Sequence, residues 1–192
     1  DIAKAIRYAA DNGAKVINGS FGKYHSTNPE WVWDAIKYAQ TKDVLFVNAA
    51  GNEGIDTDFT QVYPQDQLLA GEEISDNFLT VGALNFEYGS GLIAGFSNYG
   101  KSSVDVFAPG VAIYSTGPNN KYRNAGGTSM ASPAAAGVAA VIRSQYPKLT
   151  ASQVKKVIMD SGLTTSARVI LGGNEGDMKP FGETTVSGKM VN

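Results

Sequence analysis

The chain has 192 residues, a net charge of −2, 43% hydrophobic residues and 18% charged residues, which is typical of one globular domain. It shows no basic stripe for nucleic acid and no apolar run near the roughly 20 residues that span a bilayer. Because it contains no cysteine, disulfides, thiolate metal sites and a cysteine nucleophile are excluded together.

The first third of the chain predicts alternating helices and strands. Residues 1–13 have the apolar spacing of a helix that stops at its final glycine, and 15–20 are predicted to form a strand. A second helix is predicted from Pro29 to about residue 42, with Trp31 among its apolar positions. Residues 44–50 are apolar except for Asn48 and do not alternate with polar residues, which indicates a strand buried on both faces. Strand, helix and strand at this spacing predict a parallel sheet with crossover helices.

The rest of the chain continues the pattern after a long polar and acidic loop. The predicted elements are a loop over 51–77, strands over 78–84, 104–107 and 111–114 with a turn at 108–110, and helices over 128–146 and 150–162. The helix over 128–146 is small and apolar nearly all round, so it is expected to lie in the core. Thr150 and Gln153 form a capping box at the start of the last helix.

The strongest chemical signal is the segment Gly126-Gly-Thr-Ser-Met-Ala-Ser-Pro133, which places Ser129 in the first turn of a predicted helix. A serine hydroxyl is a weak nucleophile until it is positioned and deprotonated. Here the glycines would let a peptide backbone approach, and the helix N-terminus offers N–H groups to a developing oxyanion. Taken alone, the segment is also compatible with an ordinary helix start capped by Thr128 or Ser129.

Other motifs in the chain resemble the subtilase family of serine proteases in the same order. Asn48-Ala-Ala-Gly-Asn-Glu-Gly54 is similar to the family's oxyanion segment, and Val16-Ile-Asn-Gly-Ser-Phe-Gly22 is similar to its substrate-binding strand. Residues 78–83 and 106–110 match the family framework, and the resemblance runs from Asp1 to at least residue 162.

The resemblance implies a fold class and a set of roles. The fold would be α/β, with a three-layer, subtilisin-like parallel sheet flanked by helices and truncated at both ends. Ser129 would be the nucleophile and Asn52 the side-chain donor of the oxyanion hole, although Asn52 alone could also be a turn residue. The residues implied to bind substrate are Ser20, Phe21, Gly22, Ala49, Ala50, Gly51 and Thr128. The wall residues have mostly small side chains, which favours a roomy pocket that tolerates apolar side chains of the substrate.

No residue of this sequence matches the acid or the base of the family's catalytic triad. The family order is Asp, His, Ser, yet the only histidine, His25, follows the substrate strand instead of preceding it. We interpret His25 as an exposed loop residue, and Asp56 and Asp58 as loop carboxylates without a triad role. Residues 1–192 are therefore expected to be the nucleophile and oxyanion half of a catalytic domain, with negligible activity alone.

The favoured function is peptide-bond hydrolysis by a longer serine endopeptidase, through an acyl-enzyme on Ser129. An inactive, peptide-binding relative remains the alternative, whereas a nucleotide-binding domain is disfavoured because no G-x-G-x-x-G spacing joins a strand to a helix. No cofactor is required. The resemblance implies that the longer protein can bind a structural calcium ion, and the acidic stretch 53–58 is better interpreted as a solvated loop than as a weak site for it. Secretion or a cell-envelope location follows from the resemblance, and a bare sheet edge at 15–20 predicts self-association.

Overall fold

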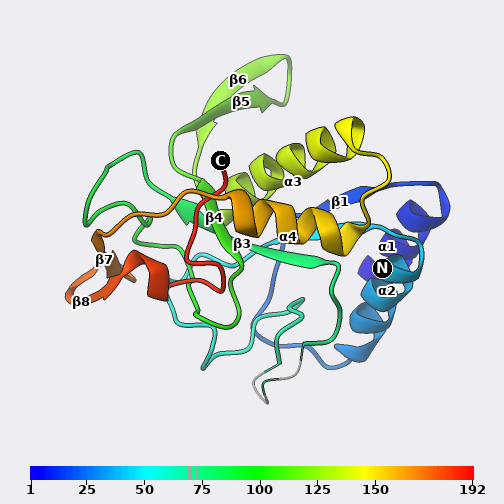
Figure 1. Cartoon of the computed structure of the whole chain (residues 1–192), viewed down its shortest axis with the longest axis horizontal. Helices are drawn as coiled ribbons and strands as arrows, with labels where there is room; N and C mark the ends of the chain where they lie inside the picture. The colour runs from blue at the N-terminus through cyan, green and yellow to red at the C-terminus, as the bar shows by residue number, and fades with distance from the viewer. Residues whose placement is uncertain (69–70, 72) are drawn as a thin grey trace.

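A four-stranded parallel sheet lies at the centre of the protein. The computed structural model describes residues 1–68, 71 and 73–192. The strands, in spatial order, are β1 (Val16–Gly19), β2 (Leu45–Ala49), β3 (Phe78–Leu84) and β4 (Val106–Pro109) (Figure 1). Every neighbouring pair is parallel, which confirms the α/β class expected from the alternating helices and strands.

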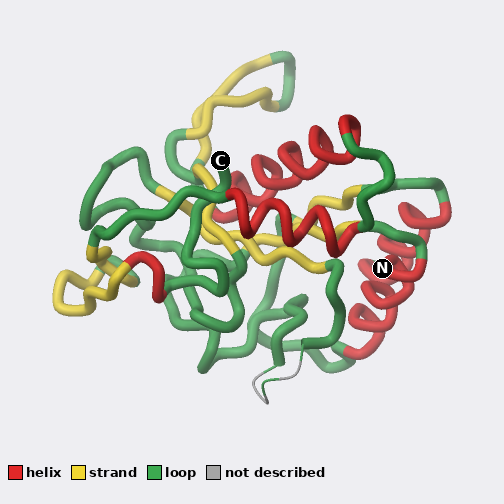
Figure 2. The backbone as a smooth tube through the Cα atoms, viewed as in Figure 1, coloured by secondary structure: helices red, strands yellow, loops and turns green. Residues whose placement is uncertain are grey.

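Two pairs of helices cover the two faces of the sheet (Figure 2). They are α1 (Ile2–Asp11), α2 (Glu30–Thr41), α3 (Thr128–Gln145) and α4 (Ala151–Ser161). Strand β2 is buried throughout, as predicted, because its alternate residues enter different cores. Leu45 and Val47 pack with α3 and α4, whereas Phe46 packs with α1 and α2. The result is the expected three-layer arrangement.

Two antiparallel hairpins were not predicted. β5 (Ile113–Gly117) pairs with β6 (Lys121–Ala125) in a hairpin that extends away from the sheet, at the top of Figure 1. The strand predicted over 111–114 was therefore misplaced, because Ala112 adopts φ +55 and the extended segment begins only at Ile113. The second hairpin joins β7 (Arg168–Leu171) to β8 (Asn174–Pro180), and a 3₁₀ turn, η1 (Phe181–Glu183), follows it.

Two expectations about the helices were met only in part. Among the apolar positions predicted for α2, Ala35, Ile36 and Ala39 are buried, but Trp31 is 65% exposed. Helix α3 was expected to lie in the core, and Ala131, Ala135 and Ala139 do, but one side of the helix faces solvent and includes Val141, which is 62% exposed. The opposite side of α3 contacts all four strands of the sheet. Small apolar residues therefore occur on both the buried and the exposed side of this helix.

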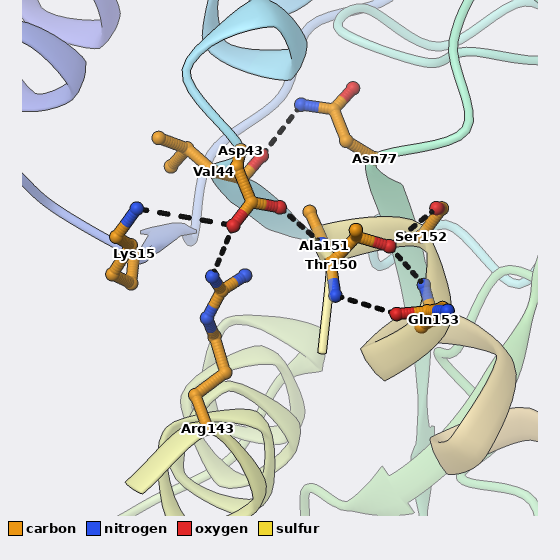
Figure 3. Close-up of polar contacts among 9 residues, drawn as sticks. All are labelled: Lys15, Asp43, Val44, Asn77, Arg143, Thr150, Ala151, Ser152 and Gln153. Carbon is orange, nitrogen blue, oxygen red and sulfur yellow. Dashed lines mark hydrogen bonds and ion pairs between the residues drawn. The ribbon is translucent and has the colours of Figure 1, made fainter. Parts of the chain in front are cut away.

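Asp43 joins the ends of several elements at one point (Figure 3). It adopts φ +56 in the turn before β2, and its carboxylate accepts hydrogen bonds from Arg143 Nη2 at 2.5 Å and from the Ala151 N–H at 2.6 Å. Lys15 Nζ lies 3.9 Å from the same carboxylate. The contacts fix the end of α3 and the start of α4 against the sheet. The capping box of Thr150 and Gln153 is formed as predicted.

Two of the segments predicted to bind substrate follow the C-terminal ends of β1 and β2. Ser20 follows β1 directly, and residues 50–52 follow β2. Ligand sites of parallel α/β sheets lie at this edge. The polar loop predicted over 51–77 contains no helix or strand among its described residues, and residues 69, 70 and 72 lie outside the described residues. Within the described part of the chain, no helix is both long and apolar enough to cross a membrane.

Candidate active site

Ser129 is the second residue of α3, which the glycine-rich segment introduces. Gly127 caps the helix with φ +143, a backbone conformation that side-chain-bearing residues rarely adopt. The Ser129 side chain is half-buried, and its Oγ donates to the carbonyl oxygen of Ser20 at 3.3 Å. The serine predicted as nucleophile therefore lies against the strand end predicted to bind substrate.

Ser20 and Ser129 are joined by a second hydrogen bond, and a proline in α3 makes its acceptor available. Pro133 has no backbone N–H, so the Ser129 carbonyl cannot receive the usual bond from four residues later in the helix. Instead it accepts a hydrogen bond from Ser20 Oγ at 2.8 Å. Because of the proline, the Ser129 carbonyl is free to accept this bond, which links the first turn of α3 to the residue that follows β1.

Asn52 lies beside this turn with its amide held in one orientation. Its Oδ1 accepts from the backbone N–H of Thr128 at 2.8 Å and from the Thr128 hydroxyl at 3.0 Å. The Thr128 hydroxyl in turn accepts from the Gly51 N–H at 3.1 Å. Because Oδ1 is bound to Thr128, the Nδ2 group is the part of the amide that can donate elsewhere.

The Asn52 amide and the Ser129 N–H lie close to one point beside Gly127. A β-carbon placed on Gly127 would be in van der Waals contact with both groups, 3.6 Å from both amide atoms of Asn52 and 3.7 Å from the Ser129 nitrogen. Asn52 and Ser129 also line one cavity, so two N–H donors lie beside the same hollow. Such a pair of donors beside a serine hydroxyl is the arrangement that stabilises the tetrahedral oxygen in acyl transfer.

A cavity of about 90 Å³ opens beside these groups. Of the predicted substrate-binding residues, those that line it are Phe21, Gly22, Ala49, Gly51 and Thr128. Ser20 is not in the lining and contacts Ser129 instead, while Ala50 is buried beneath. Tyr24, Glu53 and Val62 also line the cavity and were missed. Adjacency to Asn52 could have indicated Glu53, but no sequence signal indicated Val62, which comes from the long loop.

Asn98 is a further residue that the sequence did not reveal. Its Oδ1 accepts from the N–H groups of Glu53 and Ile55, at 3.1 and 3.2 Å, and its Nδ2 donates to the Ala50 carbonyl at 2.9 Å. The same Nδ2 lies 3.1 Å from the Tyr24 hydroxyl. Asn98 is fully buried, and it fixes the segment 51–55, which carries Asn52 and is named the oxyanion loop below after the role expected of Asn52.

Comparison with known proteins agrees with this geometry. The profile of the subtilase family (Peptidase_S8) matches residues 1–183. The chain belongs to the subtilase family. It is 47% identical over 147 residues to a thermophilic serine proteinase of Bacillus sp. (strain AK1), an alignment that covers 76% of this chain and 32% of that protein.

Two further relatives extend the match over nearly the whole chain. A cell wall-associated protease of Bacillus subtilis (strain 168) is 37% identical over 182 residues, which are 95% of this chain and 18% of that protein. The solved structure of sphericase superposes with a TM-score of 0.77 at 27% identity, covering all of this chain and 62% of that one. This subtilase chain thus spans about a third or less of the length of these two Bacillus proteins.

The remaining polar candidates of this subtilase chain make no hydrogen bond to Ser129 Oγ, which donates to the Ser20 carbonyl. His25 is exposed in the loop after β1. Asp58 accepts hydrogen bonds from the Ser102 N–H and the Ser103 hydroxyl, and Asp56 lies 3.6 Å from Lys179 Nζ. Neither aspartate is bonded to the histidine, so these residues do not form a catalytic pair.

The acidic stretch 53–58 does not fit a calcium site. Its two aspartates are committed to protein donors and to a lysine, and the Glu53 carboxylate accepts from the Asn52 N–H at 2.9 Å. Calcium prefers six to eight oxygen ligands with little competing positive charge nearby. Across the described residues, no group of three His, Cys, Asp or Glu side chains gathers in a way that could hold a metal ion.

Proposed function

We propose that this chain forms the nucleophile and oxyanion part of a serine endopeptidase, and that Ser129 Oγ attacks the peptide carbonyl. The observation that carries the proposal is the juxtaposition of Ser129 with the oriented amide of Asn52 beside a cavity. Its family membership adds support, because the relatives are named as serine proteases.

In the proposed reaction, the Ser129 Oγ–carbon bond forms as the carbonyl oxygen becomes an oxyanion. The Ser129 N–H and the Asn52 Nδ2 group donate to this oxygen. The hydroxyl proton passes to a base and then to the leaving amine, which departs from the acyl-enzyme, and water releases the acyl group. The base and its acidic partner are proposed to come from the whole protein outside residues 1–192.

The substrate is proposed to be an extended polypeptide. Phe21 and Gly22 line both the 90 Å³ cavity and a neighbouring apolar cavity of about 140 Å³, which Ile2, Val32 and Trp33 also line. Two adjoining hollows beside one strand suit alternate side chains of a peptide lying along that strand. The walls of the first cavity are larger than the sequence indicated, because Phe21, Tyr24 and Val62 line it beside glycine and alanine, and these side chains favour a small apolar side chain next to the scissile bond.

An inactive peptide-binding relative is the second candidate. The observation in its favour is that Ser129 Oγ donates to the Ser20 carbonyl, while the only histidine of the chain is exposed in a loop. A serine without a base keeps its proton at neutral pH, and substrate binding and oxyanion stabilisation alone give little turnover. The 192-residue chain alone is proposed to behave in this way.

Labelling with a fluorophosphonate probe tests the proposal. The full-length protein should react at Ser129, and the Ser129→Ala variant should not. A folded full-length protein that resists the probe and cleaves no peptide would favour the inactive relative. Residues 1–192 alone should show no turnover above that of their own Ser129→Ala variant.

The setting of the protein is proposed from its relatives. A secreted or cell-envelope location agrees with the name of the cell wall-associated protease. No cofactor takes part in the proposed chemistry. A structural calcium ion elsewhere in the whole protein remains a proposal from the resemblance.

A further inference from the structure

The oxyanion loop is held from one side by the segment that carries Asn98. Besides the two bonds to Asn98 Oδ1, the Gly54 N–H donates to the Phe96 carbonyl at 2.8 Å, and the Asn98 N–H donates to the Gly51 carbonyl at 3.0 Å. These bonds fix the loop laterally. They leave the outer side of Gly54, two residues after Asn52, to be covered by another part of the chain.

The turn between β7 and β8 covers that side through direct backbone contact. A β-carbon at Gly172 would lie 2.4 Å from the Gly54 carbonyl oxygen, and one at Gly54 would lie 2.8 Å from Gly172 Cα. The neighbouring Gly173 contacts Gly95 in the same way, with 3.2 Å between a β-carbon on Gly95 and Gly173 Cα. Three segments remote in sequence therefore touch with no side chain between them.

The β7–β8 hairpin is itself anchored on both sides of this contact. Lys179 of β8 lies 3.6 Å from Asp56, just beyond the oxyanion loop, and 5.7 Å from the centre of the Tyr99 ring. Val169 and Leu171 of β7 are buried in a cluster with Leu84 of β3 and Phe107 of β4. A hairpin fixed at these points cannot withdraw from Gly54 without breaking a core.

We infer that the β7–β8 hairpin is a positioning element for the oxyanion hole, acting through Gly172 on Gly54 to hold Asn52 in place. The inference rests on the proposed function of Asn52. Donors must lie about 2.7–3.1 Å from the developing oxyanion, and a misplacement of about 1 Å can cost on the order of 10²-fold in rate. The contact therefore affects turnover more than substrate binding.

Gly172→Ala and Gly173→Ala form a matched pair of variants. Both glycines have positive φ, +56 and +67, so alanine strains both by a similar amount. Only alanine at Gly172 collides with the oxyanion loop, because a β-carbon at Gly173 meets nothing closer than 3.7 Å. In the full-length protein, with a chromogenic peptide anilide, Gly172→Ala should lower kcat about tenfold or more at constant KM. Gly173→Ala should stay within about twofold.

A double-mutant cycle separates positioning from general destabilisation. In an Asn52→Ala background, Gly172→Ala should have no further effect on kcat, because the donor that it displaces is already gone. Equal losses in the two glycine variants, or a Gly172→Ala loss that persists without Asn52, would overturn the inference. If Gly172→Ala does not fold, Lys179→Met should lower kcat about threefold, and Lys179→Arg should restore it. Full kcat in Lys179→Met would then contradict the inference.

Amide hydrogen exchange provides a readout that needs no catalysis. The Gly54 amide should exchange about tenfold faster in Gly172→Ala than in Gly173→Ala, since only the former disturbs its bond to Phe96. A full-length wild type that hydrolyses nothing would refute the proposed function. The exchange rates alone would then test whether Gly172 holds Gly54 in place. Equal rates in the two variants would overturn it.

Discussion

The side-chain oxygen of Asn52 lies 2.8 Å from the backbone nitrogen of Thr128 and 3.0 Å from its hydroxyl, so one threonine sets the orientation of the amide. Thr128 is fully buried, and its hydroxyl also receives the Gly51 N–H. Orientation by two bonds leaves the Nδ2 group free to donate toward the volume beside Ser129. This relationship predicts which substitutions in the first turn of α3 change turnover.

Thr128→Val keeps the shape of the side chain but removes both hydroxyl bonds. The Gly51 N–H would lose its partner at a cost of about 1–3 kcal/mol, and Asn52 would keep only one of its two anchors. Labelling of Ser129 by a fluorophosphonate in the full-length protein should slow about tenfold. Thr128→Ser, which retains the hydroxyl, should react nearly as fast as the wild type. Equal rates in both variants would contradict the orienting role.

Ser20→Ala removes the donor that replaces the missing N–H of Pro133. The Ser129 carbonyl would be left without its 2.8 Å bond, and the free energy of unfolding should fall by about 1–2 kcal/mol. Adding Pro133→Ala should restore part of this loss, because the new N–H can reach the Ser129 carbonyl. Denaturant unfolding of the two variants measures the effect. Ser144→Ala, an exposed site on the same helix, is the control, and a Ser20→Ala loss no larger than its effect would refute the account.

Asp43→Asn should destabilise the fold because Arg143 is 7% exposed and would lose its charged partner. We expect a loss of about 1–3 kcal/mol, below the range for fully buried pairs, since the Asp43 side chain is 41% exposed. Lys15→Gln, which removes only the exposed ion pair at 3.9 Å, should change stability by less than about 0.5 kcal/mol. Denaturant unfolding at neutral pH distinguishes the two, and similar losses would contradict a special role for Arg143.

The pH dependence of Asp43 follows from the same contacts. Partial burial opposes ionisation, but the Arg143 hydrogen bond and the Ala151 N–H outweigh it and lower the pKa of Asp43 below 3.8. A carboxylate with a lowered folded pKa stabilises the fold above its unfolded pKa and loses that contribution as the pH falls through the folded value. Below about pH 4, the stability gap between wild type and Asp43→Asn should therefore narrow.

Asp66 should give stability the opposite dependence on pH. It is 4% exposed, and burial raises its pKa from 3.8 to about 8, although Lys155 Nζ at 3.5 Å opposes the rise. The folded state then holds a proton that the unfolded state releases, so stability falls as the pH rises from about 4 to 8. Asp66→Asn should flatten the melting temperature over this interval, whereas Asp76→Asn, at an exposed site, should leave it unchanged. An unaltered slope in Asp66→Asn would show that Asp66 is ionised throughout.

The free edge of β1 predicts self-association of the 192-residue chain. Among the described residues, β1 pairs with β2 alone, and Val16 and Ile17 are half-buried, so the outer edge of this part of the sheet presents unpaired backbone groups beside apolar side chains. Light scattering should give a mass above that of the monomer that rises with concentration. Tyr8→Ser, which removes a 72% exposed aromatic from α1, should not change this mass. A stable monomer at all concentrations would refute association through the edge.

Local signals in the sequence were sufficient for the framework. The nearly continuous apolar run of β2, the capping box at Thr150 and the alternation of helices with strands each act over a few residues, and all three are present as predicted. Prediction failed where a side chain's environment depends on distant segments. Trp31 is exposed because smaller residues of α2 cover the sheet, and β5–β6 begins after a positive-φ alanine that no local pattern indicates.

The sequence by itself determined the family and named Ser129 and Asn52, because the motifs around them are short and contiguous. Only the tertiary structure decided how the two are held. Thr128 orients the Asn52 amide across 76 residues, Asn98 fixes the loop across 43 to 48, and Gly172 contacts Gly54 through backbone alone. Such contacts join segments that have no local relationship, so they follow from the packed sheet and hairpins rather than from any pattern along the chain.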